Sequence, residues 1–271
     1  MGDLMESFSV LMSLYYRENA NFFEECLSSL HNQTVVANEI IIVLDGKITP
    51  ELESVILKWQ DLLPLVTVPL LENVGLGKAL RIGVTYCSNR LVARMDTDDI
   101  CLPTRFEKQL IQFKNNPQLV LIGSNVCEYS EDWNQKLSEK VVPCDYLSIR
   151  SYAKYRNPFN HMTVMFDKDK IIEAGSYCHH LFMEDYNLWL RCLSKDYYML
   201  NLAENLVSVR TGISMLKRRR GIEYIKSELE LFKLKNRLKY TPKTHGLVVL
   251  ALRVFPRLMP VFILGKLYKK R

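Results

Sequence analysis

The amino-acid sequence predicts an α/β fold in which a doubly wound, mostly parallel sheet is flanked by helices. Apolar runs of strand length alternate with segments of helical periodicity from residue 8 onward, and this alternation is typical of parallel sheets. The early runs also end in polar or glycine-bearing turns. In open α/β sheets, ligands bind at the carboxyl ends of the strands, so these turns are the first place to look for a site.

The first half of the chain supplies the clearest alternation. Apolar runs predict strands over Phe8–Leu14, Glu39–Leu44 and Leu65–Pro69, and a further strand from Leu91. Helical patterns follow these runs through residues 22–30, from Pro50 to about Leu62, and from the turn at 73–79. The second half predicts a helix over Arg105–Asn115, strands over Leu119–Ile122 and Met162–Phe166, a polar, turn-like stretch over Glu128–Pro143, and a helix after Asp185.

Composition describes an ordinary globular protein. The 271 residues suffice for one core, or for one core with an appended subdomain. With 48 % hydrophobic and 24 % charged residues, and only 11 Gly and 10 Pro, the chain is neither disordered nor of low complexity. The seven cysteines are scattered and form no Cys-x-x-Cys pair, which predicts reduced thiols. Because no apolar run near the N-terminus resembles a signal peptide, we expect a cytoplasmic protein.

Charge is distributed unevenly along the chain. Residues 217–271 contain 16 Lys or Arg against 3 acids, whereas residues 1–216 contain 20 against 27, within a formal net charge of +6. A basic tail on an acidic body predicts a polyanionic partner, either nucleic acid or the anionic face of a membrane.

Three carboxylates are crowded into four residues after the run that begins at Leu91. Asp96, Asp98 and Asp99 would repel one another unless a cation compensates, and hard ions such as Mg²⁺ or Mn²⁺ prefer oxygen ligands. The alternative is an acidic loop that starts a helix, with Asp99 or Thr104 as its cap. The strand-like run before the acids favours a metal site, as does the opening of the next helix only at Pro103-Thr104-Arg105.

The turns that follow the other strands are each only a weak indication of a ligand-binding site. Asp45-Gly46 alone reads as a turn, and Gly75-Leu76-Gly77 is too loose for a phosphate-loop fingerprint. Their expected common edge gives them weight, since a carboxylate there can accept a hydrogen bond from a uracil ring and a lysine at a helix start can meet a phosphate. Likewise, Asp185 could simply cap its helix, with Trp189 in the core and His161 in a structural turn.

Taken in order, six short motifs resemble family 2 glycosyltransferases, which have the GT-A fold. They are Ser13-x-Tyr15, Asp45-Gly46, Asn73-x-Gly-x-Gly-Lys78-Ala79, Arg94-x-Asp96-x-Asp98-Asp99, Asn157-x-x-x-His161 and Glu184-Asp185-Tyr-x-Leu-Trp189. The resemblance covers roughly residues 7–215. The segment Lys217–Gly221, with the charged helix after it, further resembles bacterial enzymes that build O-antigen and exopolysaccharide repeat units, including amylovoran-type enzymes and β-1,3-galactosyltransferases.

The resemblance implies a nucleotide-diphosphate sugar as donor. Ser13, Tyr15 and Asp45 would lie at the uracil, and Asn73 and Lys78 near the ribose and the phosphates. Asp98 and Asp96 would be the metal residues, for Mn²⁺ or Mg²⁺. Asp98 is the expected direct ligand, Asp96 would reach the ribose or lie behind the metal, and Asp99 would steady the loop. The metal would neutralise the leaving diphosphate.

The resemblance also implies how the acceptor is handled. Asp185 would be the catalytic base for a single displacement with inversion. His161, Glu184, Trp189 and Arg210 would bind or back the acceptor, with Arg210 close to the diphosphate. Arg218–Arg220 would meet a lipid diphosphate. Many relatives carry a histidine in the segment that corresponds to residues 210–214; this chain has none, so we expect no histidine metal ligand there.

These expectations divide the chain into a catalytic domain over 1–215 and a helical, basic, membrane-associating extension over 216–271. Within the first, about 1–125 would bind the nucleotide sugar, and about 126–215 the acceptor. The segment 246–271 is interrupted by Arg and Pro and does not fit a spanning helix. It fits an interfacial anchor on an anionic leaflet, although Val248–Leu252 fits a helix packed on the domain equally well.

The sequence thus predicts a peripheral protein on the cytoplasmic face of the bacterial inner membrane. Its expected reaction moves a hexose from a UDP-sugar, preferably UDP-galactose in β-1,3 linkage, to a polyprenyl-diphosphate-linked sugar. UDP-glucose and UDP-N-acetylhexosamine remain open as donors. A nucleotidyltransferase would carry a Gly-rich turn where this chain has Tyr15-Tyr16-Arg17-Glu18. A non-catalytic membrane-binding or nucleic-acid-binding module is the other alternative. Nucleic acid is not the expected partner, because few aromatic residues interleave the basic ones.

Overall fold

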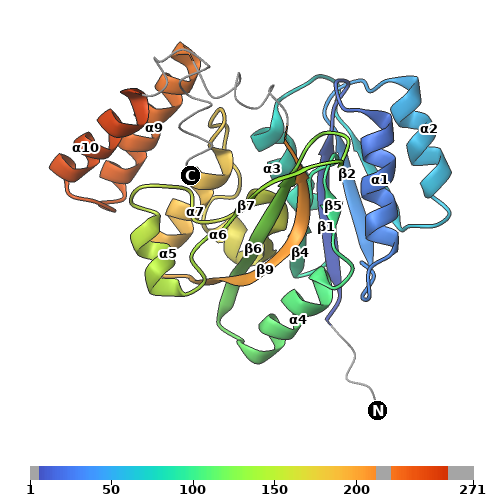
Figure 1. The fold of residues 1–271 in the computed structure, drawn as a ribbon, viewed down its shortest axis with the longest axis horizontal. Helices are drawn as coiled ribbons and strands as arrows, with labels where there is room; N and C mark the ends of the chain where they lie inside the picture. The colour runs from blue at the N-terminus through green and yellow to red at the C-terminus, as the bar shows by residue number, and fades with distance from the viewer. Residues whose placement is uncertain (1–5, 212–220, 256–271) are drawn as a thin grey trace.

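The computed structural model describes residues 6–211 and 221–255. These residues build one mixed sheet with helices on both faces (Figure 1). Its strands are β1 (Phe8–Leu14), β2 (Glu39–Leu44), β3 (Leu65–Pro69), β4 (Leu91–Arg94), β5 (Ile100–Cys101), β6 (Leu119–Tyr129), β7 (Lys136–Lys140), β8 (Met165–Asp167) and β9 (Tyr198–Arg210). The order is β3-β2-β1-β4-β8-β6-β9-β5, with β7 paired to β6.

The longest ladders of the sheet are parallel. β1 pairs in parallel with β2 and β4, β2 with β3, and β6 with β9. The short strand β8 runs antiparallel between β4 and β6 and joins the two parallel halves. The predicted α/β class, with its mostly parallel and doubly wound sheet, is therefore confirmed.

Nine helices cover the sheet within the described part of the chain. They are α1 (Ala20–His31), α2 (Pro50–Trp59), α3 (Leu76–Tyr86), α4 (Arg105–Asn115), α5 (Tyr146–Tyr152), α6 (Lys168–Glu173), α7 (Glu184–Ser194), α9 (Ile222–Arg237) and α10 (Lys243–Val254), and a short 3-10 turn, η1, spans His161–Thr163. One apolar core joins the sheet to α1, α2 and α4; the other joins it to α3, α5, α6, α7 and α9. Alternate residues of β1 point to opposite cores, as its pleat requires, with Val10 and Met12 in the first and Leu11 in the second.

Local sequence explains where several helices begin. The side-chain oxygen of Asn19 accepts the Asn21 amide at 2.9 Å and so caps α1. Thr49 precedes α2, and Pro50 occupies its first position, where the missing N–H costs nothing. Asp145 and Asp167 cap α5 and α6 by accepting the amides of Ser148 and Lys170.

Three sequence-based boundaries were wrong. β6 does not end at Ile122 but continues to Tyr129, and the stretch expected to be turn-like contains β7. The residues of β7 are all exposed, so this strand carries no apolar pattern and depends on main-chain pairing with β6. The predicted strand from Met162 begins only at Met165, because the Thr163 hydroxyl bonds to the Asn160 carbonyl and fixes a 3-10 turn. Helix α2 ends at Trp59, before Leu62.

The described C-terminal helices pack on the α7 face of the molecule, at the opposite end from α1 and α2 in the view of Figure 1. Tyr224 and Leu231 of α9 belong to the same core as α7. Helix α10 lies against α9 through Gly246 and Val249, and leaves Leu247, Val248, Leu252 and Phe255 exposed. The segment Val248–Leu252 thus has one packed side and one free side.

Arg253 lies in the segment expected to form the anchor, and it packs on the folded body. Its guanidinium bonds to the Glu228 carboxylate at 2.6 Å and to the Tyr155 carbonyl at 3.0 Å. Arg218–Arg220 and Lys266–Arg271 lie outside the described residues. None of the helices described is long and apolar enough to cross a bilayer.

Candidate active site

Parallel strands β1, β2 and β4 bring three of the predicted turns to one edge of the sheet. Ser13 lies opposite Val43 near the end of β1, with Tyr15 just beyond it, and Asp45 follows β2 directly. The acidic residues follow β4. The expectation that these residues share an edge is met by the register of the strands.

Asp45 ties the β2 turn to the turn before α3. Its two carboxylate oxygens accept the amides of Val74 at 2.7 Å and Gly75 at 3.0 Å, and the Asn73 side chain donates to the Asp45 carbonyl at 3.1 Å. The turns are so close that a Cβ on Gly46, whose φ is +83°, would lie 2.8 Å from the Asn73 nitrogen. Lys78 lies in the first turn of α3 with its side chain exposed.

The three acids after β4 form one carboxylate cluster. Ligand atoms of Asp96, Asp98 and Asp99 all lie within 4.8 Å of one another. Burial and the neighbouring Asp96 charge raise the pKa of Asp98 to about 6, and burial together with Asp98 raises the pKa of Asp99 well above its usual value. One oxygen of Asp99 accepts the Arg210 amide at 3.1 Å, and the other is buried without a hydrogen-bond partner among residues 6–211 and 221–255. Such a set of crowded, underpaired oxygens fits a hard divalent cation.

Two arginines hold this cluster in place. Arg94, which is buried, forms an ion pair with Asp96, while its Nε and Nη1 atoms have no hydrogen-bond partner within the part of the chain that the structure describes. Arg210 donates to the Asp98 carbonyl at 2.6 Å and to the Glu131 carbonyl at 3.1 Å, and pairs with Glu25.

The Arg210 guanidinium also lies between two aromatic rings, 3.8 Å from the centroid of Phe22 and 4.4 Å from that of Trp133. Arg210 was expected near a diphosphate. In the structure its main-chain amide and its guanidinium donate to Asp99 and to the Asp98 carbonyl, and so support the acidic loop.

Helix α7 brings the second pair of acids to the site. Asp185 accepts the Tyr186 amide and the Asn157 side-chain amide, each at 2.6 Å. It does not cap α7, since Met183 occupies that position. Burial raises the pKa of Asp185, and burial with the Asp185 charge raises the pKa of Glu184 to about 7. The pair is therefore partly desolvated and holds protons more tightly than ordinary carboxyls.

His161 lies in an aromatic cluster with Tyr177 and Trp189. Its Nε2 atom is 3.0 Å from the Tyr177 hydroxyl, and its ring lies edge-on to Trp189, with centroids 6.1 Å apart. Burial and the Arg94 charge lower the pKa of His161 well below its usual value, so the imidazole is neutral. Trp189 is fully buried, and its ring packs against the rings of His161 and Tyr177.

The two groups of acids belong to one site. A Cβ on Gly77 would lie 2.6 Å from the Cys178 carbonyl and 3.2 Å from Glu184 Cβ, so the start of α3 touches the segment that leads into α7. Burial raises the pKa of all four acids, and the Arg94 charge opposes this rise at Asp98 and Asp99 on one side and at Glu184 and Asp185 on the other. Arg94 therefore connects the two carboxylate groups electrostatically.

Sequence reasoning assigned no role to Arg94, Tyr177 or Asn157. For Arg94 the available signal was its position in the otherwise apolar, buried run from Leu91 to Met95. A charged side chain is rarely buried unless it has a partner, so this position indicated an ion pair. Asn157 began one of the six motifs but was given no role, and Tyr177 had no local signal; the partners of Tyr177 and Asn157 lie 16 and 28 residues away.

Comparison with known proteins identifies the family. Residues 9–183 match the model of glycosyl transferase family 2. The amylovoran biosynthesis glycosyltransferase AmsE of Erwinia amylovora is 50 % identical over 97 % of this chain and 98 % of its own. An Escherichia coli UDP-Gal:alpha-D-GlcNAc-diphosphoundecaprenol beta-1,3-galactosyltransferase is 37 % identical over 100 % of this chain and 98 % of its own.

Solved structures agree on the fold. S. aureus TarS 1–349 in complex with UDP-GlcNAc matches with a TM-score of 0.69 at 16 % identity, over 91 % of this chain and 71 % of that one. The mannosyltransferase PcManGT of Pyrobaculum calidifontis, in complex with GDP-Man and Mn²⁺, matches with a TM-score of 0.65 at 14 % identity, over 92 % of this chain and 74 % of that one. The fold is thus of the GT-A type. By its sequence and its architecture, this chain belongs to glycosyltransferase family 2.

Proposed function

We propose that the protein is a metal-dependent, inverting glycosyltransferase that moves a hexose from a UDP-sugar to a lipid-diphosphate-linked sugar. The observation that carries this proposal is the pairing of two acid groups around Arg94, one at the end of β4 and one at the start of α7. The role in O-antigen or exopolysaccharide synthesis rests on the two relatives at 50 % and 37 % identity. The name of the second supports UDP-galactose and a β-1,3 linkage.

The donor is bound along the edge formed by β1, β2 and α3. Ser13, Tyr15 and Asp45 surround the uracil, and Asn73 lies at the ribose. Lys78, exposed in the first turn of α3, meets the diphosphate, where a helix start and a cation both favour negative charge. The binding of UDP-GlcNAc by a structural neighbour supports this use of the fold.

Asp98 and Asp96 hold the metal ion, with Asp99 fixing the loop beneath them. The raised pKa of Asp98 supports this assignment, since a divalent cation relieves the repulsion that raises it. When bound, Mn²⁺ or Mg²⁺ supplies Lewis-acid stabilisation of the leaving UDP. Arg210 contributes by keeping the Asp98 main chain in place.

Asp185 acts as the base. The acceptor hydroxyl attacks the anomeric carbon on the face opposite UDP, its proton passes to an oxygen of Asp185, and the bond between the anomeric carbon and the diphosphate oxygen breaks. Asn157 and the Tyr186 amide orient the carboxylate for this transfer. Glu184 and neutral His161 position the acceptor, and Trp189 supports them from behind.

Helices α9 and α10, which we call the C-terminal pair, bring the enzyme to the acceptor. Leu247, Val248, Leu252 and Phe255 form the exposed side of α10, and they are carried on a strongly basic extension. An apolar helix face with basic residues binds anionic lipid surfaces. We assign the enzyme to the cytoplasmic face of the inner membrane, where nucleotide sugars and lipid-linked acceptors meet.

A donor screen tests the proposal. UDP-galactose, UDP-glucose and UDP-N-acetylhexosamines are offered with Mn²⁺ and a synthetic N-acetylglucosamine-diphosphate-lipid, and the product is analysed by NMR. We expect galactose to be transferred in β configuration from the α-linked donor. Retention of configuration, or no transfer from any UDP-sugar, would overturn the proposal. Transfer from UDP-glucose alone would keep the reaction class and correct the donor.

A further inference from the structure

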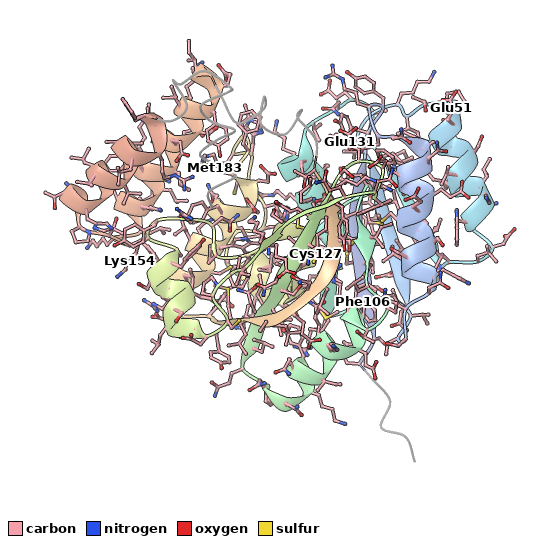
Figure 2. All side chains as sticks on the ribbon, in the orientation of Figure 1. Glu51, Phe106, Cys127, Glu131, Lys154 and Met183 are labelled. Atoms are coloured by element: carbon pink, nitrogen blue, oxygen red, sulfur yellow. The ribbon has the colours of Figure 1, made fainter. Side chains whose placement is uncertain are left out.

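The C-terminal pair, α9 and α10, holds the end of α5 and the turn after it by a set of side-chain hydrogen bonds. The last carbonyls of a helix lack partners within the helix, and the Arg150 carbonyl in the last turn of α5 accepts the Tyr240 hydroxyl at 2.9 Å. In the turn that follows α5, Lys235 Nζ donates to the Lys154 carbonyl at 2.8 Å and Arg253 Nη1 to the Tyr155 carbonyl at 3.0 Å. In Figure 2, Lys154 is labelled on the α5 side that faces this pair.

Lys235 makes a second contact that reaches α7. Its ammonium donates to the Tyr186 hydroxyl at 2.9 Å, and that hydroxyl donates to the Ala153 carbonyl at 2.7 Å. Lys235 and Tyr186 are both buried. We call this arrangement the Lys235 clasp, made of the Lys235 ammonium, the Tyr186 hydroxyl and the carbonyls of Ala153 and Lys154. It joins three segments that are far apart in the sequence.

The clasp joins the same two segments that hold the proposed base. The Asp185 carboxylate accepts one hydrogen bond from the Tyr186 amide and one from the Asn157 side chain. Tyr186 belongs to α7, and Asn157 lies three residues after Lys154. A shift of the α5 end relative to α7 would therefore move one donor away from Asp185 while the other stayed in place.

The chemistry of Lys235 fits a geometric role. Burial and the Arg253 charge lower the pKa of Lys235 to about 7, so its position is unfavourable for a charged ammonium, although Glu228 opposes the shift. A methionine would fill the same space without this desolvation cost. What an ammonium adds is several donors on one atom, which can bind a carbonyl and a hydroxyl from two segments at once.

We propose that Lys235 is a positioning residue for Asp185, and that the C-terminal pair α9–α10 thereby sets the geometry of the base as well as contacting lipid. This inference rests on the proposed role of Asp185. It predicts that the clasp affects proton transfer from the acceptor and leaves nucleotide binding unchanged, because the donor edge is built from β1, β2 and α3.

The first test compares Lys235→Met with Lys233→Met, the same substitution at an exposed position two residues away on α9. We expect kcat of Lys235→Met to fall roughly tenfold to a hundredfold, as is common when a catalytic group is displaced by a fraction of an ångström. Affinity for UDP with Mn²⁺, measured by calorimetry, should stay within about twofold of wild type. Lys233→Met should match wild type in both measurements.

The decisive test is a double-mutant cycle with Asp185→Asn. If Lys235 acts through the Asp185 carboxylate, adding Lys235→Met to Asp185→Asn should lower kcat no further. Tyr186→Phe, which removes only the clasp hydroxyl, is combined with Asp185→Asn in the same way, and replaces Lys235→Met in the test if that variant fails to fold. If the fold-losses in kcat of the two single variants multiply in the double variant, the clasp acts on the fold generally and the inference is overturned.

The outcomes separate this inference from the proposed function. An impaired Asp185→Asn with a normal Lys235→Met and a normal Tyr186→Phe would overturn the positioning role alone. A normal Asp185→Asn would overturn the assignment of the base, and the positioning role with it.

Discussion

Arg94 lies between two groups of carboxylates that otherwise repel one another. Its ion pair with Asp96 fixes one group, and its charge opposes the rise that burial and Asp185 cause in the pKa of Glu184 in the other. Arg210 is a second support, since it bonds to the main chain of Asp98 and pairs with Glu25. At the residue scale, the candidate site therefore depends on two arginines as much as on its acids.

Substitution of Arg210 tests this support. Arg210→Met keeps the stacking volume between Phe22 and Trp133 but removes the donors to the Asp98 and Glu131 carbonyls. We expect the free energy of unfolding to fall by about 1–3 kcal/mol, and affinity for Mn²⁺ in the presence of UDP to fall as well.

The control for Arg210 is Arg81→Met, at an exposed position on α3. Chemical denaturation and calorimetry measure the two effects. An Arg210→Met variant with unchanged Mn²⁺ affinity would show that the acidic loop does not need this support.

The pKa of Glu184 makes stability depend on pH. Since the folded state raises this pKa to about 7, folded protein binds more protons than unfolded protein between about pH 4.5 and 7. Burial of the ionised carboxylate therefore destabilises the folded state by an amount that is negligible below this window and grows as pH rises through it. In EDTA, Glu184→Gln should therefore melt roughly 2–6 °C above wild type at pH 8 and differ little at pH 4.5. Parallel pH profiles of melting temperature would contradict this account.

At the scale of elements, the contact between α3 and the segment before α7 joins the donor edge to the base. Gly77 allows it, because a Cβ there would lie 2.6 Å from the main-chain Cys178 carbonyl. Backbone atoms yield less readily than flexible side chains, so the two elements would have to separate.

Gly77→Ala should accordingly lower stability by about 1–3 kcal/mol and lower transfer activity in parallel. Thr85→Ala, on the exposed side of the same helix, should leave transfer unchanged. Denaturation curves and initial rates measure both effects. If Gly77→Ala had wild-type kcat, the spacing of α3 and α7 would not govern the reaction.

The elements themselves differed in how well the sequence predicted them. β1, β2 and β3 were located to the residue. β1 and β2 are buried on both faces and therefore read as continuous apolar runs, whereas β3 is mostly exposed and was found from its short apolar run alone. The hairpin partner β7 is fully exposed and carried no such signal. The family resemblance predicted that Asp98 and Asp185 serve a common site. The contacts of Arg210 with Asp98, of Asn157 with Asp185 and of Tyr177 with His161 arise only in the tertiary structure.

At the scale of the whole molecule, the C-terminal pair is part of the folded body as well as the proposed contact with lipid. Glu228 and Arg253 form an ion pair between α9 and α10 in which Glu228 is buried and Arg253 is partly buried, so a truncation after His245 would leave the buried Glu228 without this partner. Breaking a buried pair is strongly destabilising. The membrane contact is better tested by altering the exposed side of α10 alone.

We expect a variant with Ser at Leu247, Val248, Leu252 and Phe255 to stay folded and active on a short-chain, water-soluble acceptor. It should lose most of its flotation with phosphatidylglycerol vesicles, and what binding remains should be more sensitive to salt. A variant with Ser at Val36, Leu57 and Leu62, which are exposed but remote from α10, is the control. Equal flotation of the two variants would show that α10 does not contribute to lipid binding.

The central claim is that the acids after β4 and those of α7 serve different steps of one transfer reaction. Parallel assays of Asp98→Ala and Asp185→Asn test it most directly, with UDP–Mn²⁺ binding measured by calorimetry and galactose transfer measured on a lipid-diphosphate acceptor. Asp98→Ala should lose both metal-dependent UDP binding and transfer. Asp185→Asn should bind UDP and Mn²⁺ like wild type, while its transfer rate falls by a factor of about 10² or more. Undiminished transfer by either variant, or wild-type transfer in excess EDTA, would contradict the account.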